Sequence, residues 1–273
     1  MSPNLEFYQE MGNKIEQLIR PATFPLAIKL IKDQSEIPPS SKRPKDMNLQ
    51  NFMCQDFKMA RSYGWTMAVT EEDCNCKLAR AVFGWDPQSK ETMEFAHQFN
   101  IGLYAKDLEI SKKLEKNLYF LENKFWGLVI SPLVRTKIEP NVVLIYCLPA
   151  QAMRLIQGYL YCEGGVMQFT AAGRIGSCHD GVIKAFVTNK PQLVILGNGD
   201  RVWGGAQDSE IMFSCPRDKL SILIEGLEAT HAAGLRYPIP TYMNYTPGFQ
   251  ADFQKKAYKR AGGTIVKEKE VKK

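Results

Sequence analysis

The sequence has no hydrophobic run long enough to cross a membrane. Its longest apolar stretches, such as Val142 to Leu148, fall far short of the roughly 20 residues that a bilayer-spanning helix needs. Met1 to Arg20 mixes polar residues with both signs of charge and lacks the apolar core and cleavage site of a signal peptide. We therefore expect a soluble, cytoplasmic protein with no membrane partner.

Several common motifs are also missing. There are three histidines, no His-Glu-x-x-His, no nucleophile elbow and no Cys-x₂-Cys-x₂-Cys run. Seven cysteines in 273 residues are too dilute, and odd in number, for a small disulfide-stapled secreted domain. The net charge of +6 equals that of the tail Lys255 to Lys273, and no basic stripe with interleaved aromatics is present. Nucleic acid is therefore excluded as a predicted partner.

The composition, 45% hydrophobic and 11% aromatic, is that of a globular protein with one large domain or two smaller ones. Apolar spacing and turn residues predict alternating helices and strands. In the first half the expected helices are Leu5 to Leu18, Leu49 to Ser62, Cys76 to Phe83 and Leu108 to Leu121, and the expected strands are Pro25 to Ile31 and Trp65 to Thr70.

The second half repeats this order, which favours an internal duplication. The strand Val142 to Tyr146 corresponds to the first strand, and Gln151 to Tyr159 to the second helix. Tyr161 to Thr170 resembles Arg61 to Thr70, since each segment reaches a glycine, a predicted strand and a threonine. Cys178 follows Cys76 at the same offset of about 100 residues. We expect an α/β (or α+β) fold of two pseudo-symmetric strand-helix-strand-helix halves. The predicted divisions are an N-terminal helix (1–21), two halves (22–135 and 136–240) and a C-terminal extension with a basic tail (241–273).

Five cysteines lie among polar or turn residues, where a thiol is accessible to a ligand: Cys54, Cys74, Cys76, Cys178 and Cys215. Helix N-termini favour thiolate, because their free N–H groups and dipole stabilise negative charge. Four thiolates from separate loops suit a [4Fe–4S] cluster or a structural zinc ion. Zinc is less favoured because histidines are few and the usual close-spaced cysteine pairs of zinc sites are absent. Scattered reduced thiols remain the alternative, and Cys147 and Cys162 are given no role.

Two glycine-rich segments each carry an arginine. Gly197 to Gly205 follows the predicted strand Gln192 to Leu196 and is expected to form a tight turn that contains Arg201. Gly173 to Gly176 contains Arg174. The two arginines could together bind an anion. His179 adjoins Cys178, but adjacent side chains rarely face each other, so we expect a satisfied histidine rather than a Cys–His nucleophile.

These motifs resemble the archaeal and bacterial family named domain of unknown function 169, over roughly Ile15 to Gly234. The likeness rests on Cys54-Gln55, on the Cys76 helix that leads to Gly84, on Glu163-Gly164-Gly165, on Cys178 after a glycine turn, and on Gly199-Asp200-Arg201 before Cys215-Pro216. The family name carries no activity. The resemblance implies a cytoplasmic protein typical of anaerobes and archaea, in which oxygen-sensitive clusters are tolerated.

The sequence therefore predicts an iron–sulfur protein with an electron-transfer or accessory redox role in anaerobic metabolism. The predicted iron ligands are Cys54, Cys76, Cys178 and Cys215, with Cys74 as the alternate to Cys76. Arg174 and Arg201 would stabilise the charge of the cluster or bind an anion. A redox protein and a second copy of the chain are the partners considered. The alternatives are a non-redox module for an anionic metabolite and a structural zinc protein.

Overall fold

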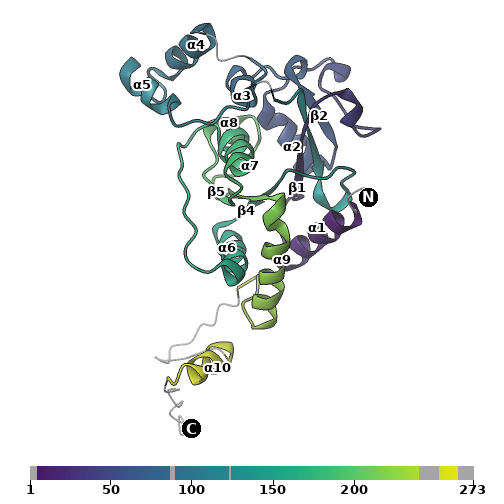
Figure 1. The fold of residues 1–273 in the computed structure, drawn as a ribbon, viewed down its shortest axis with the longest axis vertical. Helices are drawn as coiled ribbons and strands as arrows, with labels where there is room; N and C mark the ends of the chain where they lie inside the picture. Colours follow the sequence, from purple (N-terminus) through teal and green to yellow (C-terminus); the bar gives the residue numbers. More distant parts are fainter. Residues whose placement is uncertain (1–4, 87–89, 123, 240–251, 264–273) are drawn as a thin grey trace.

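The computed structural model describes residues 5–86, 90–122, 124–239 and 252–263. These residues form one sheet with helices packed on it. Six antiparallel strands form a single sheet in the order β2-β3-β1-β4-β6-β5. Figure 1 labels β2, β1, β4 and β5, which follow this order from right to left. The strands are β1 (Leu26–Ile31), β2 (Met67–Thr70), β3 (Gly127–Pro132), β4 (Val142–Cys147), β5 (Gln192–Val194) and β6 (Ile211–Pro216). The mixed α/β prediction is confirmed.

Helices cover both faces of the sheet, so its strands are apolar on both sides. In β1, Leu26 and Ile28 pack into one core while Ala27 and Ile31 pack into the other. One face carries α2 (Met53–Tyr63), α3 (Lys77–Phe83), the π-helical turn η5 (Gly176–Ile183), α7 (Lys184–Thr188) and α8 (Asn198–Val202). The other carries α1 (Leu5–Ile19), α6 (Pro149–Glu163) and α9 (Arg217–Ala232).

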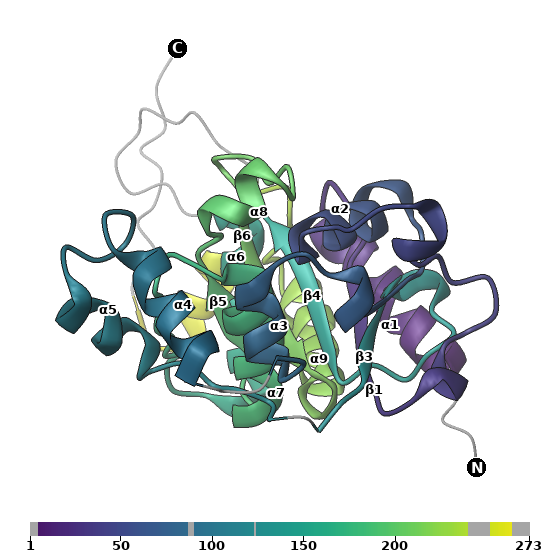
Figure 2. The same ribbon diagram turned by 90° about the horizontal axis from the view of Figure 1, so that it is seen from above.

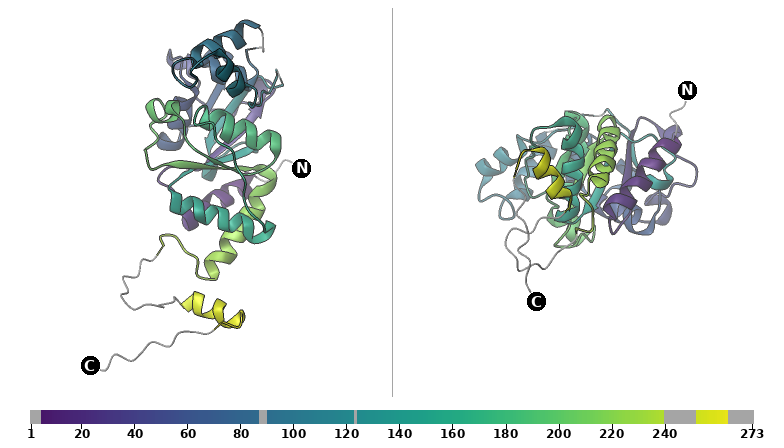
Figure 3. Two further views of the ribbon diagram at one scale, coloured as in Figure 1. Left: turned by 90° about the vertical axis from the view of Figure 1, so that its left-hand side faces the viewer. Right: turned by 90° about the horizontal axis from the view of Figure 1, so that it is seen from below.

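The views from different sides make the layering visible. In Figure 2, α3 lies in front of the sheet and α9 behind it. Figure 3 shows the purple α1 beside the light-green α9. None of the described helices combines the length and the apolar character that a membrane span requires.

Two helices pack on each other to one side of the sheet and its covering helices. They are α4 (Lys90–Asn100) and α5 (Leu108–Glu115), at the upper left of Figure 1. A further helix, α10 (Asp252–Arg260), lies near the C-terminus, and short 3₁₀ turns occur at Gln34–Glu36, Lys45–Met47, Glu71–Asp73 and Leu133–Arg135.

The two halves of the sheet have matching strand order and register. Read outward from the central β1–β4 pair, each half has an inner strand, a middle strand formed last in the chain, and an outer strand. The first residue of each inner strand, Leu26 or Val142, pairs with the proline that ends the middle strand. The first residue of each outer strand, Met67 or Gln192, pairs with the fourth residue of the middle strand. The inner strands pair symmetrically about Ala27 and Val143.

Most expected elements are present, but two local predictions are wrong. The predicted strand within Tyr161 to Thr170 does not form: α6 extends to Glu163, and Gly164 and Gly165, both with positive φ, end it. The Gly197 to Gly205 segment is not a simple turn between strands, because α8 occupies Asn198–Val202. There the Asp200 carboxylate accepts from the Gly197 N–H and closes a helical turn.

Candidate functional site

Three of the predicted ligands, Cys54, Cys76 and Cys178, line one cavity of about 160 Å³. Cys54 is the second residue of α2, Cys76 is the N-cap residue of α3, and Cys178 is the third residue of η5. These elements lie on the same face of the sheet, where α2 and α3 both contact η5. The fold therefore brings together thiols from three separate stretches of chain.

The three thiols are close enough to affect one another. A hydrogen bond with Cys54, together with burial, raises the pKa of Cys178 well above its usual range. Burial raises the pKa of Cys76 to about 11, although the N–H groups of Ala79 and Leu78 at the start of α3 oppose this. Cys76 and Cys178 are therefore neutral thiols at pH 7, and a bound cation would be needed to make these two thiolates.

The segment that carries Cys178 has an unusual backbone. Ile175 adopts a left-handed conformation with φ of 51°, which is strained for a β-branched residue. The π-helical segment that follows, Gly176–Ile183, is a rare structure that is frequent at functional sites. Ser177 anchors it through a 2.7 Å hydrogen bond between its hydroxyl and that of Tyr146 on β4. Gly176 is required here, because a Cβ atom would lie 2.7 Å from Asp200 Oδ2.

The walls of the cavity are largely apolar and aromatic. Phe52 stacks on Trp203 with ring centroids 4.8 Å apart, and Leu78, Phe99 and Tyr104 complete the rim. Pockets for metabolites and organic cofactors usually measure about 300–1,000 Å³. The cysteine-lined cavity is smaller than this and suits a small inorganic group.

The two predicted arginines are not brought to a common point. Arg174 lines the cavity, but its guanidinium is already paired: Nη2 lies 2.6 Å from Glu115 Oε1, and Nη1 donates to Asn100 Oδ1 at 2.8 Å. Arg201 does not line the cavity, and its Nη1 donates to the Gln207 carbonyl oxygen. The joint anion site predicted from the two glycine loops has no support in this arrangement.

The remaining cysteines lie elsewhere. Cys215, on β6, packs into the core under α1, α6 and α9, on the opposite face of the sheet, so the structure does not gather it with the other three. Cys74 is buried below the start of α3 and contacts the Cys76 carbonyl oxygen at 3.9 Å, but it does not line the cavity. Of the two alternates, Cys76 is the one at the site. Cys147 is buried and Cys162 is exposed.

His179 has a hydrogen-bond partner at each ring nitrogen, as expected from its sequence context. Its Nδ1 lies 2.8 Å from Asp180 Oδ1, and its Nε2 accepts from the Tyr119 N–H at 2.9 Å. Both ring nitrogens are therefore used within the core.

Within residues 5–86, 90–122, 124–239 and 252–263, no three His, Cys, Asp or Glu side chains converge to hold a single metal ion.

Sequence reasoning missed Asp200 and Trp203 as cavity residues. Both come from the Gly197 to Gly205 segment, which the sequence marked as unusual but assigned to a turn. The glycines were the available signal. Gly199 places α8 against Cys54, since a Cβ atom there would lie in contact with Cys54 Sγ at 3.4 Å.

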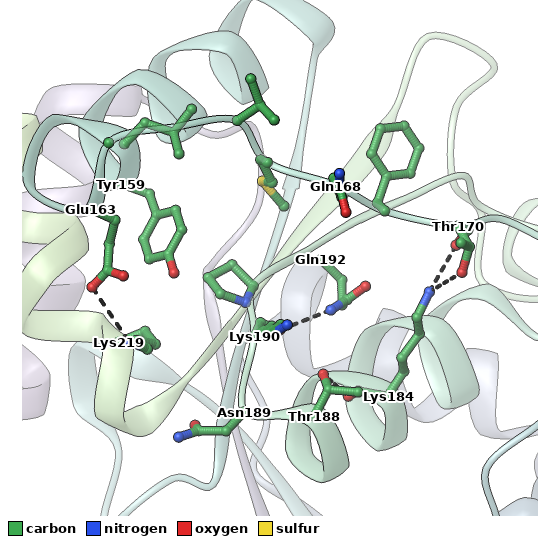
Figure 4. Close-up of a pocket in the computed structure, with 16 residues that line it drawn as sticks. Tyr159, Glu163, Gln168, Thr170, Lys184, Thr188, Asn189, Lys190, Gln192 and Lys219 are labelled. Atoms are coloured by element: carbon green, nitrogen blue, oxygen red, sulfur yellow. Dashed lines mark hydrogen bonds and ion pairs between the residues drawn. The ribbon is translucent and has the colours of Figure 1, made fainter.

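A second cavity, of about 630 Å³, opens between the end of α6, the chain that follows it, α7 and β5 (Figure 4). Its cationic residues are Lys184, Lys190 and Lys219. Lys184 donates to the Thr170 carbonyl oxygen at 3.0 Å, and Lys219 lies 3.4 Å from Glu163. No cysteine lines this cavity. Its size falls in the range of metabolite pockets.

Comparisons with known proteins give a family but no activity. The model of the family domain of unknown function 169, described as an uncharacterised ArCR, matches residues 14–226. The chain is 27% identical over 206 residues to the uncharacterized protein MJ0308 of Methanocaldococcus jannaschii, covering 74% of this chain and 86% of that protein. No solved structure matches. Because the family model spans most of the chain, including all three cavity cysteines, this protein belongs to the domain of unknown function 169 family.

Proposed function

We propose that Cys54, Cys76 and Cys178 bind an iron–sulfur cluster, and that the protein has an electron-transfer or accessory redox role. The observation that carries this proposal is the convergence of three thiols, from separate stretches of chain, on one small cavity. Thiolates are the usual protein ligands of such clusters.

The arrangement favours a cluster over one ion. A zinc ion needs all its ligands around a single point, and the described residues offer no such group. A cluster differs because each thiolate bonds a different iron atom. When bound, it would supply one-electron chemistry. The chain's own part is to hold the thiols and to limit water, for which the stacked Phe52 and Trp203 are well placed.

We also infer that the fold arose by duplication and that the cavity lies near the axis relating the two halves. The matching strand order and register support this. So do the contacts between helices: α3 contacts η5, and α8 contacts α2. In this correspondence α2 matches η5, since each precedes the outer strand of its half. Each contains Cys-x-Asp in its first five residues, at Cys54 to Asp56 and at Cys178 to Asp180, so Cys178 corresponds to Cys54 rather than to Cys76.

Ligand variants test the cluster proposal. After anaerobic purification, we expect the wild-type protein to show the broad visible absorption of an iron–sulfur cluster. Cys54→Ser, Cys76→Ser and Cys178→Ser should each lose most of it. Cys215→Ser is the matched control, because Cys215 is buried on the opposite face of the sheet. Equal absorption in all four variants, or loss only in Cys215→Ser, would overturn the assignment.

A second candidate function is the binding of a small anionic metabolite in the cavity of Figure 4. Three lysines and one glutamate line it, which leaves an excess of positive charge. Thermal denaturation with inorganic phosphate and with citrate should then show stabilisation that Lys184→Ala and Lys190→Ala reduce. Stabilisation that survives both substitutions would exclude this cavity as the anion site.

A further inference from the structure

The three cavity thiols leave one of the four irons of a [4Fe–4S] cluster without a protein ligand. Resting on the proposed function, we propose that the Asp200 carboxylate supplies the fourth ligand. Asp200 lines the same cavity as Cys54, Cys76 and Cys178, and it is 4% exposed.

The carboxylate of Asp200 is held in place by one of its oxygens and keeps the other available. Oδ2 accepts from the Gly197 N–H at 2.9 Å and from the Ser177 N–H at 3.4 Å. Among the described residues, both hydrogen bonds to this carboxylate go to Oδ2 and none goes to Oδ1. The residue before it, Gly199, lies against the Cys54 thiol, since a Cβ atom there would lie 3.4 Å from Cys54 Sγ. The carboxylate is therefore held at the cavity beside the cysteines.

Two other buried carboxylates each also keep one oxygen without a hydrogen-bond partner, Asp56 Oδ2 and Asp180 Oδ2. Asp56 Oδ1 accepts from Asn51 Nδ2 at 2.8 Å, and Asp180 pairs with His179. Neither lines the cavity, and Cys215 packs on the far face of the sheet. Among the described residues that line the cavity, Asp200 is the one carboxylate.

A carboxylate ligand has a definite chemical consequence. It carries the same single negative charge as a thiolate, so the total charge of the site is unchanged. Carboxylate oxygen is a harder ligand than thiolate sulfur and suits the iron of these clusters less well. The iron at Asp200 should therefore be the first to dissociate.

Substitutions at Asp200 test this inference. Asp200→Asn keeps an oxygen that can accept from Gly197 but removes the charge, and Asp208→Asn is the control on the exposed loop after α8. We expect about four irons per chain in the wild type and the control, and about three in Asp200→Asn with the paramagnetic signal of a three-iron cluster. Asp200→Cys should restore four irons and lengthen the life of the cluster in air.

The outcomes separate this inference from the proposed function. A wild-type protein without iron refutes both. A second outcome refutes only the role of Asp200. In it, the wild-type cluster depends on the three cysteines, Asp200→Asn leaves the cluster unchanged, and Asp200→Cys does not lengthen its life in air. Mössbauer spectroscopy of the wild-type protein does not depend on the folding of any variant. One iron site distinct from the other three is expected, and four sites with equivalent sulfur ligation would overturn the inference.

Discussion

The buried pair between Arg174 and Glu115 ties α5 to the strained segment that carries Cys178, and its removal should be costly. Both side chains are almost fully enclosed, at 2% and 4% exposure, and their charged atoms lie 2.6 Å apart. Glu115→Ala leaves the Arg174 guanidinium buried beside a neutral amide and with its Nε already lacking a partner. Breaking a buried ion pair from one side costs about 3–5 kcal/mol, so we expect a loss of that size in the free energy of unfolding.

A matched control lies on the same helix. Glu109, which lies 3.2 Å from Lys112 on the surface of α5, should cost no more than about 1 kcal/mol when replaced by alanine. Urea denaturation measures both values. Hydrogen exchange should show faster opening of residues 174–183 in Glu115→Ala alone. Equal destabilisation by the two substitutions would refute the assigned role of the buried pair.

Two further predictions concern the helical layer opposite the site and the reactivity of the thiols. Gly226→Ala should lower the free energy of unfolding by about 3 kcal/mol or more, because its Cβ atom would lie 1.8 Å from the Gly158 carbonyl oxygen. The control Glu225→Ala, on the exposed side of α9, should change it by less than about 0.5 kcal/mol. An equally mild effect of Gly226→Ala in urea denaturation would contradict the close approach of α6 and α9. In the native protein at pH 8, iodoacetamide should modify the exposed Cys162 first and leave Cys215 unmodified, because Cys215 is buried and burial raises its pKa. Peptide mass mapping that finds Cys215 modified first would contradict its placement.

The regular elements could be predicted from the sequence because their apolar spacing is local. The helices at Lys77–Phe83 and Met53–Tyr63 and the strand at Val142–Cys147 lie close to their expected positions. The strand predicted within Tyr161 to Thr170 failed because its apolar residues follow two glycines with positive φ and pair with no other strand. Strand partners depend on contacts between residues distant in the chain, which a local pattern does not contain.

The candidate site was partly predictable for the same reason. Cys54, Cys76 and Cys178 stand at or near the starts of helices, which the sequence indicates. Cys215 also precedes a helix, yet its position on β6 turns its side chain to the opposite face of the sheet, and alternation along a strand cannot be oriented without knowing the partner strands. Asp200 was missed because its place depends on how α8 packs against α2.

The central claim is that the three cavity cysteines hold an iron–sulfur cluster, and the most direct test is iron and acid-labile sulfide analysis of the full chain purified without oxygen. We expect a brown protein with about four irons and about four sulfides per chain. A colourless protein that contains neither after anaerobic purification and anaerobic reconstitution with iron and sulfide would contradict it.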